Sequence, residues 1–172
     1  MLMINETCGF NFVEFESESE FKEYVNSNKS IFINESSSYR KRFFSLYNKK
    51  KDINIGIYGG ANGISPTIIF LRKEPFILIS SDEVIGCIDI EQKCVKWLTN
   101  FDSIVYTLQD LDDGSILIVC ELVASRINYD GKVLWKYFSK DVITNYEFHS
   151  SFIKIITEED EHEISLQEGN FM

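Results

Sequence analysis

The sequence of 172 residues has little of what breaks regular structure and little of what builds catalytic or metal sites. It contains two prolines and nine glycines, which argues against a disordered chain. Its two histidines, His149 and His162, belong to no His-Glu-x-x-His pair and no Cys-x-x-Cys set. Because adjacent strand residues point to opposite faces, His149 and Ser150 do not form a nucleophile–base pair. We therefore expect no metal site, no cofactor and no enzymatic activity.

Long apolar runs are also missing. The chain begins MLMINETCGFNF, without the positive and apolar regions of a secretory signal, and residues 67–71 are too few to cross a bilayer. These features predict a soluble, cytoplasmic protein that does not associate with a membrane. Of the four cysteines, Cys87 and Cys94 could face each other within disulfide reach. The favoured alternative is that all four are reduced and mostly buried.

Basic residues are scarce overall, because the formal net charge is −10. This acidity makes nucleic acid an unsuitable partner for the molecule as a whole. The charge is uneven: residues 36–75 hold eight basic and two acidic side chains, whereas residues 141–172 hold one basic and eight acidic ones. A basic segment is therefore followed by an acidic C-terminal region.

Aromatic residues are plentiful, and with the many Ile and Val residues they favour β structure. The clearest hairpin is in residues 114–137, where Asp130 and Gly131 suit a two-residue type I′ turn. That turn would place Ile127 opposite Leu134 and Arg126 opposite Trp135. Both faces of this hairpin are partly apolar, so it should lie within a layered β structure.

Residues 1–52 read as a mixed α/β part of a single domain that spans residues 1–172. Strands are expected at residues 9–15 and 31–33, and a helix at 17–27, where Ser17 and Glu20 form a capping box. A second helix is expected at residues 36–49 because Phe43, Leu46 and Tyr47 fall on one stripe. Its basic side chains suggest a solvated face, with a nucleic-acid patch as the alternative.

Residues 53–172 read as a β-meander with a repeat of about 38 residues. Residues 76–98 align with 115–137 at an offset of 39 and then 38, which matches Trp97 with Trp135, and residues 152–170 form a third partial copy. The glycine-rich segment 59–63 lacks the Gly-x-x-x-x-Gly-Lys pattern of a phosphate loop, so we interpret it as a connection between strands.

The repeat Ile-Asn-Tyr-Asp-Gly-Lys-Val-Leu-Trp-Lys-Tyr, residues 127–137, resembles a quinoprotein-type (PQQ-like) blade of a β-propeller. The resemblance spans residues 76–170. Two and a half blades cannot close a ring, so the resemblance implies an open, incomplete propeller. The fold class we predict is mainly β, an open antiparallel meander of blade-like repeats with two short N-terminal α-helices. No quinone-binding site residues match, so no such activity is implied.

Two acidic turns are the candidate partner-binding residues. Because they follow strands of successive repeats, we expect them to lie at corresponding positions and form one acidic rim. A solvated loop and an oxygen-liganded cation site are the alternatives for the second turn. The candidate residues are Asp110, Asp112, Asp113, Glu158, Glu159, Asp160, Glu161 and Glu163.

The small size, acidity and lack of catalytic groups resemble the profile of bacterial immunity proteins, which inhibit a cognate toxin, such as a basic nuclease, by covering its active site. The expected function is therefore inhibition of a basic protein partner. One alternative is a small-ligand or carbohydrate-binding module that uses Trp97, Trp135, Tyr129 and Tyr137. Another is an enzyme that uses the glycine-rich loop.

Overall fold

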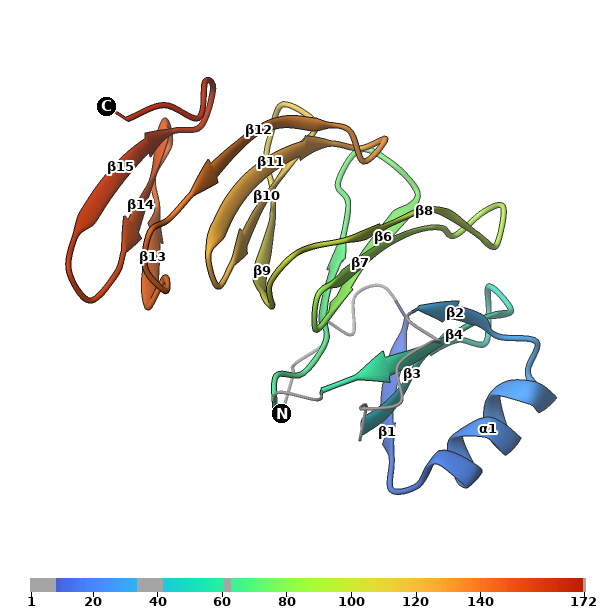
Figure 1. The fold of residues 1–172 in the computed structure, drawn as a ribbon. Helices are drawn as coiled ribbons and strands as arrows, with labels where there is room; N and C mark the ends of the chain where they lie inside the picture. The colour runs from blue at the N-terminus through green and yellow to red at the C-terminus, as the bar shows by residue number, and fades with distance from the viewer. Residues whose placement is uncertain (1–8, 34–41, 61–62, 172) are drawn as a thin grey trace.

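The computed structural model describes residues 9–33, 42–60 and 63–171 (Figure 1). Within these ranges the chain forms one short helix and fifteen strands, arranged as four sheets in sequence order along an open array. The fold is therefore mainly β with blade-like antiparallel sheets, as predicted.

The N-terminal sheet has the strand order β1-β3-β4-β2, and helix α1 covers its outer side (Figure 1). Only β2 runs parallel to its neighbour, β4. Since β4 pairs with β3, the boundary predicted between residues 52 and 53 falls inside this sheet. The elements are β1 (Asn11–Phe15), α1 (Glu18–Ser27), β2 (Ile31–Ile33), β3 (Arg42–Asn48) and β4 (Ile53–Gly59).

Helix α1 begins as predicted, because the Ser17 hydroxyl accepts a hydrogen bond from the backbone N–H of Glu20 at 3.2 Å. The second predicted helix is wrong for residues 42–48, which form strand β3, while residues 34–41 lie outside the described ranges. Phe43 packs on Phe21 of α1, whereas Phe44 and Leu46 enter the core on the opposite face. Both faces of β3 are buried, so its apolar residues satisfy helical spacing without forming a helix.

Three antiparallel sheets follow, which we call the first, second and third blades. The first blade contains β5 (Thr67–Phe70), β6 (Phe76–Ser81), β7 (Val84–Asp89) and β8 (Cys94–Asn100). The second contains β9 (Val105–Asp110), β10 (Ser115–Cys120), β11 (Val123–Asn128) and β12 (Val133–Phe138). The third contains β13 (Asn145–Phe148), β14 (Phe152–Ile156) and β15 (Glu161–Ser165). These elements match the predicted repeat.

The core consists of layers between successive sheets. Alternating residues of a central strand enter different layers: Leu78 faces the second blade, and Ile77 faces the N-terminal sheet. In the second blade, Ile118 faces the first blade and Leu117 faces the third. This explains why β6 and β10 are buried along their whole length, since both faces of each sheet are covered.

The β11–β12 turn differs from the predicted type I′ turn, although Arg126 lies opposite Trp135 as expected. Gly131 has φ of +79°, but Asp130 does not adopt a positive φ. The Gly131 N–H donates to the Asn128 carbonyl at 2.9 Å, and a bulge shifts the register so that Ile127 pairs with Val133. A type I turn followed by a left-handed glycine produces this arrangement, which demands positive φ of only one residue.

The two tryptophans occupy equivalent places, each on the glycine turn of the next blade. The Trp97 indole N–H donates to the Tyr129 carbonyl at 2.9 Å, beside Gly131. The Trp135 indole N–H donates to the Leu166 carbonyl at 2.8 Å, and its ring lies against Gly169. Each tryptophan therefore joins two sheets.

The cysteines in the described ranges are free. Cys87 lies opposite Trp97 and is buried, whereas Cys94 lies opposite Asp89 and is exposed. The disulfide considered between Cys87 and Cys94 is therefore wrong, because the two residues are not opposite each other. Burial raises the pKa of the Cys87 thiol, and that of Cys120, to about 12.

Candidate functional site

The first predicted acidic turn, at the β9–β10 connection, uses its carboxylates within the fold. Asp110 is buried and accepts hydrogen bonds from the Arg72 backbone N–H at 3.1 Å and the Tyr129 hydroxyl at 2.6 Å. Asp112 forms an ion pair with the Arg72 guanidinium at 2.6 Å. Two of the three acids thus hold the first blade to the second.

Asp113, the third acid of this turn, is engaged by Arg126 and Ser115. The Ser115 hydroxyl donates to Asp113 at 2.6 Å, and the Arg126 guanidinium forms an ion pair with the same carboxylate. The hydrogen bond from Ser115, with the charge of Arg126, lowers the pKa of Asp113. Because these carboxylates already have partners, they offer little free charge to another molecule.

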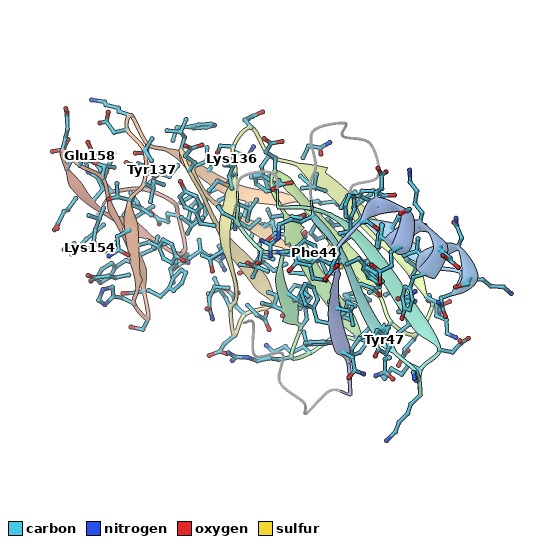
Figure 2. The ribbon with its side chains drawn as sticks, turned by 90° about the horizontal axis from the view of Figure 1, so that it is seen from below. Phe44, Tyr47, Lys136, Tyr137, Lys154 and Glu158 are labelled. Carbon is cyan, nitrogen blue, oxygen red and sulfur yellow. The ribbon has the colours of Figure 1, made fainter. Side chains whose placement is uncertain are left out.

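The second predicted acidic turn, at the β14–β15 connection, has a different character. Its backbone is folded by Thr157, whose hydroxyl accepts from the N–H groups of Glu159 and Asp160 at 3.3 and 3.0 Å. Glu158, Glu159 and Asp160 are all exposed, and none forms an ion pair with any residue in the described ranges. Figure 2 shows Glu158 at the third-blade end of the array, far from Phe44. This turn presents three free carboxylates to solvent.

The two acidic turns do not share one rim, so that prediction is wrong. Strand β14 runs in the direction of β10, and the turn at residues 157–160 therefore matches the β10–β11 turn at Glu121 and Leu122. The turn of Asp112 lies at the other end of the strands (Figure 1). The sequence alignment paired the strands correctly, but acidity alone did not show which hairpin turn each run occupies.

We call the two ends the Asp112 end and the Glu121 end. Equivalent backbone hydrogen bonds connect successive blades at the Glu121 end. The Val105 N–H donates to the Asp82 carbonyl at 2.8 Å, and the Ile143 N–H donates to the Glu121 carbonyl at 2.8 Å. Besides the buried Asp82, the acidic side chains gathered at this end are Glu83, Asp102, Glu121, Asp141, Glu158, Glu159 and Asp160. The first four of these seven were missed from the sequence because they belong to no long acidic run.

The remaining predicted acids, Glu161 and Glu163, lie on the outer face of the third blade. Lys154 projects from β14 between them and forms an ion pair with Glu161 at 2.5 Å. Together with Glu147 they raise the pKa of Lys154, the hydrogen bond to Glu161 being the main cause. This face is charged, whereas the corresponding faces of the first and second blades are apolar.

A cleft of about 940 Å³ lies at the Asp112 end between the second and third blades. Its lining includes Arg126, whose guanidinium donates to the Ser115 hydroxyl and, at 2.6 Å, to the Leu166 carbonyl. His149 also lines it and stacks on Phe152 at a ring-centroid distance of 4.2 Å. The cleft is polar, but its strongest donor is committed to contacts within the chain.

The aromatic residues considered for carbohydrate binding are engaged between sheets. Trp135 is 8% exposed and Trp97 half-buried, and both lie on glycine turns. Tyr129 binds Asp110, and Tyr137 packs against His162 and Phe171. These rings do not form an open stacking platform.

The described part of the chain contains no group of three or more His, Cys, Asp or Glu side chains arranged to hold a metal ion. Nor does it contain a helix of sufficient length and apolarity to span a membrane.

Comparison with known proteins supports the fold but does not indicate a family or a function. No protein-family model matches the chain. No curated protein matches it either. Among solved structures, the chain is similar to the Neurospora crassa Pan2 WD40 domain (TM-score 0.54, 12% identity, 64% of this chain and 38% of that one).

Two further solved structures are similar. They are the dihydro-heme d1 dehydrogenase NirN (TM-score 0.56, 9% identity, 76% of this chain and 33% of that one) and the β-propeller domain of Myceliophteria thermophila Cps50 (TM-score 0.50, 16% identity, 61% and 36%). The chain thus matches about a third of the length of each of these proteins. At identities of 9–16%, this similarity supports the fold alone, an array of propeller-type blades.

Proposed function

We propose that this protein is a non-enzymatic inhibitor that binds a basic protein, and that it acts as an immunity protein against a cognate bacterial toxin such as a basic nuclease. The observation that carries the proposal is the exposed turn of Glu158, Glu159 and Asp160, whose carboxylates have no ion-pair partner in the described ranges. An array of free carboxylates steers a basic partner into contact and can occupy a groove that otherwise accepts phosphate groups.

The acidic surface we assign to this role differs from the one predicted. Asp110, Asp112 and Asp113 are committed to contacts within the fold, so we assign them to stability. Glu158, Glu159 and Asp160 remain, together with the neighbouring acids of the Glu121 end. A cytoplasmic location and the absence of a nucleic-acid partner are parts of the same proposal, as is the PQQ-like character of the blades, which the tryptophan–glycine contacts support.

The test is to purify the tagged chain from its source cells, identify the co-purifying protein and express that protein alone. The proposal expects the captured protein to arrest growth and this chain to restore it. Glu158→Lys/Glu159→Lys/Asp160→Lys should weaken the complex by about 10- to 100-fold at low salt. The control, Glu16→Lys/Glu23→Lys/Glu91→Lys, makes the same change in charge elsewhere on the exposed surface. A captured protein that is harmless to growth would overturn the toxin assignment.

A second candidate function is a small-ligand module, which the cleft at the Asp112 end favours because of its volume of about 940 Å³ and its polar lining. This function can be tested by measuring the melting temperature of the protein in the presence of a panel of monosaccharides and nucleotides. A concentration-dependent rise that Arg126→Ala abolishes would favour it over the protein inhibitor.

A further inference from the structure

Three exposed apolar side chains lie on neighbouring backbone segments at the Glu121 end. Leu122 is 39% exposed, Phe138 65% and Val142 45%. Backbone hydrogen bonds join their neighbours: the Ser139 N–H donates to the Leu122 carbonyl at 2.9 Å, and Ile143 donates to Glu121. We call Leu122, Phe138 and Val142 the apolar patch.

The first blade shows that the fold does not require apolar residues at the positions of Leu122 and Phe138, whereas Val142 corresponds to Ile104, which is also apolar. There the Phe101 N–H donates to the Glu83 carbonyl, as Ser139 donates to Leu122, so Glu83 corresponds to Leu122. By the same relation Asn100 corresponds to Phe138. Equivalent turns with identical backbone bonds thus carry Glu and Asn in one blade and Leu and Phe in the next. Apolar side chains left in solvent without a folding role mark an interaction surface.

The surroundings of the apolar patch hold more acidic than basic side chains, although Lys136 and Lys140 are also exposed beside it. Glu121 precedes Leu122, Asp141 precedes Val142, and the Thr144 N–H donates to the Ile156 carbonyl, which brings the turn of Glu158–Asp160 alongside. The charge of Asp160 contributes to the raised pKa of Tyr137, whose main cause is burial, so this turn lies near the end of β12. Figure 2 shows Tyr137 and Glu158 on neighbouring layers at that side of the molecule.

We propose that the apolar patch is the centre of the partner-binding surface and receives an apolar side chain that the partner presents among lysines and arginines. This inference rests on the proposed function and specifies its contact. A desolvated apolar centre ringed by charge is the arrangement in which a few residues supply most of the binding energy. Anionic lipid headgroups and a second copy of this chain, with its net charge of −10, are both disfavoured by the excess of acidic side chains around the patch.

The probe is a synthetic peptide, Lys-Lys-Leu-Phe-Lys-Lys, titrated into the full chain with methyl-labelled Leu and Val and followed by NMR. Its companions are Lys-Lys-Gly-Ser-Lys-Lys and Glu-Glu-Leu-Phe-Glu-Glu. We expect saturable shifts at the methyl groups of Leu122 and Val142 with the first peptide, about tenfold weaker binding of the second, and no binding of the third.

Leu122→Glu/Phe138→Asn installs the residues of the first blade, so the variant should fold. It should weaken the first peptide by about tenfold or more even though its added charge attracts lysine. The matched control, Leu134→Glu/Val133→Asn, makes the same Leu→Glu change and another apolar-to-Asn change at the other end of β12, where the two side chains are 52% and 48% exposed. It should leave binding unchanged.

Three results would refute the proposal that the apolar patch binds the partner. These are NMR shifts confined to other surfaces, equal binding of the first two peptides, and equal effects of the two double variants. The outcome is separable from that of the proposed function. A captured partner that binds through the apolar patch but does not arrest growth removes the toxin assignment and leaves the patch. A captured toxin whose binding survives Leu122→Glu/Phe138→Asn removes the patch and leaves the toxin assignment.

Discussion

The contact between Trp97 and Gly131 predicts a specific loss of stability for Gly131→Ala. An added Cβ would lie 2.9 Å from Cδ2 of the Trp97 ring, 3.1 Å from Cε2 and 3.2 Å from Cγ. The indole cannot simply swing aside, because its N–H is held by the Tyr129 carbonyl at 2.9 Å. Either the ring or the turn must move, and both belong to the interface between the first and second blades.

The expected loss in the free energy of unfolding has two parts. Alanine in the left-handed region costs about 1–2 kcal/mol, and overpacking at an ordered contact adds about 1–3 kcal/mol. Gly114→Ala separates them, because Gly114 has φ of +85°, close to the +79° of Gly131, and a Cβ added there would lie 3.9 Å from Cε2 of Tyr129. Gly114→Ala should therefore lose only the backbone part, and Gly131→Ala about 1–3 kcal/mol more.

Urea unfolding followed by tryptophan fluorescence measures both losses, with equal m values required for the comparison. A third variant, Gly63→Ala, has φ of +78° and no atom within 4 Å of the added Cβ, and it should behave like Gly114→Ala. If all three variants lose the same free energy, the tryptophan does not pack on the turn. The joining of blades by tryptophan would then be refuted.

Three other results are expected. Asp110→Asn should cost about 1–3 kcal/mol in urea unfolding, because a buried acceptor of the Arg72 N–H and the Tyr129 hydroxyl is altered; an unchanged midpoint would contradict this. In a Cys8→Ser background, Cys94 should react with a thiol reagent at pH 8 while Cys87 and Cys120, with pKa values of about 12, react only on unfolding; three equal rates would contradict their burial. Since the pKa of Asp113 is lowered in the fold, its contribution to stability is present above the ordinary aspartate pKa and lost as the pH falls through the folded value. Asp113→Asn should therefore flatten the fall in stability below about pH 4, and an unchanged slope would contradict the assignment.

The repeat was the part of the fold that the sequence could predict. Aligning Trp97 with Trp135 placed the strands of two blades at the observed offsets. The alignment works because both blades are buried on both faces, so that equivalent positions need similar side chains. The N-terminal sheet was harder to predict, because β3 is covered by α1 on one face and by the first blade on the other. Its apolar residues therefore occur on both faces, and periodicity alone could not separate a strand from a helix.

The two acidic turns show that the charge pattern of a sequence does not reveal which carboxylates are paired in the fold. Asp112 and Glu158 look alike in the sequence, yet the first is paired with Arg72, forty positions away, and the second with no cation in the described ranges. The partner of Asp112 is set by the stacking of blades, which a pattern of acids does not report. The apolar patch was missed for a similar reason, because only the backbone hydrogen bonds at the turns bring the segments of Leu122, Phe138 and Val142 to one end of the second blade.

The outer faces of the two terminal sheets are kept from exposing apolar surface in different ways. This explains how four sheets remain stable without closing a ring. On the N-terminal sheet, Phe21 and Val25 of α1 cover the outer apolar face. On the third blade no helix is needed, since Lys154, Glu161 and Glu163 make the outer face of β14 and β15 polar. Because the sheets are held together by the layers between them, the turns of the array are free to vary. The substitution of Glu83 and Asn100 in one blade by Leu122 and Phe138 in the next is such a variation, and the partner surface that we propose depends on it.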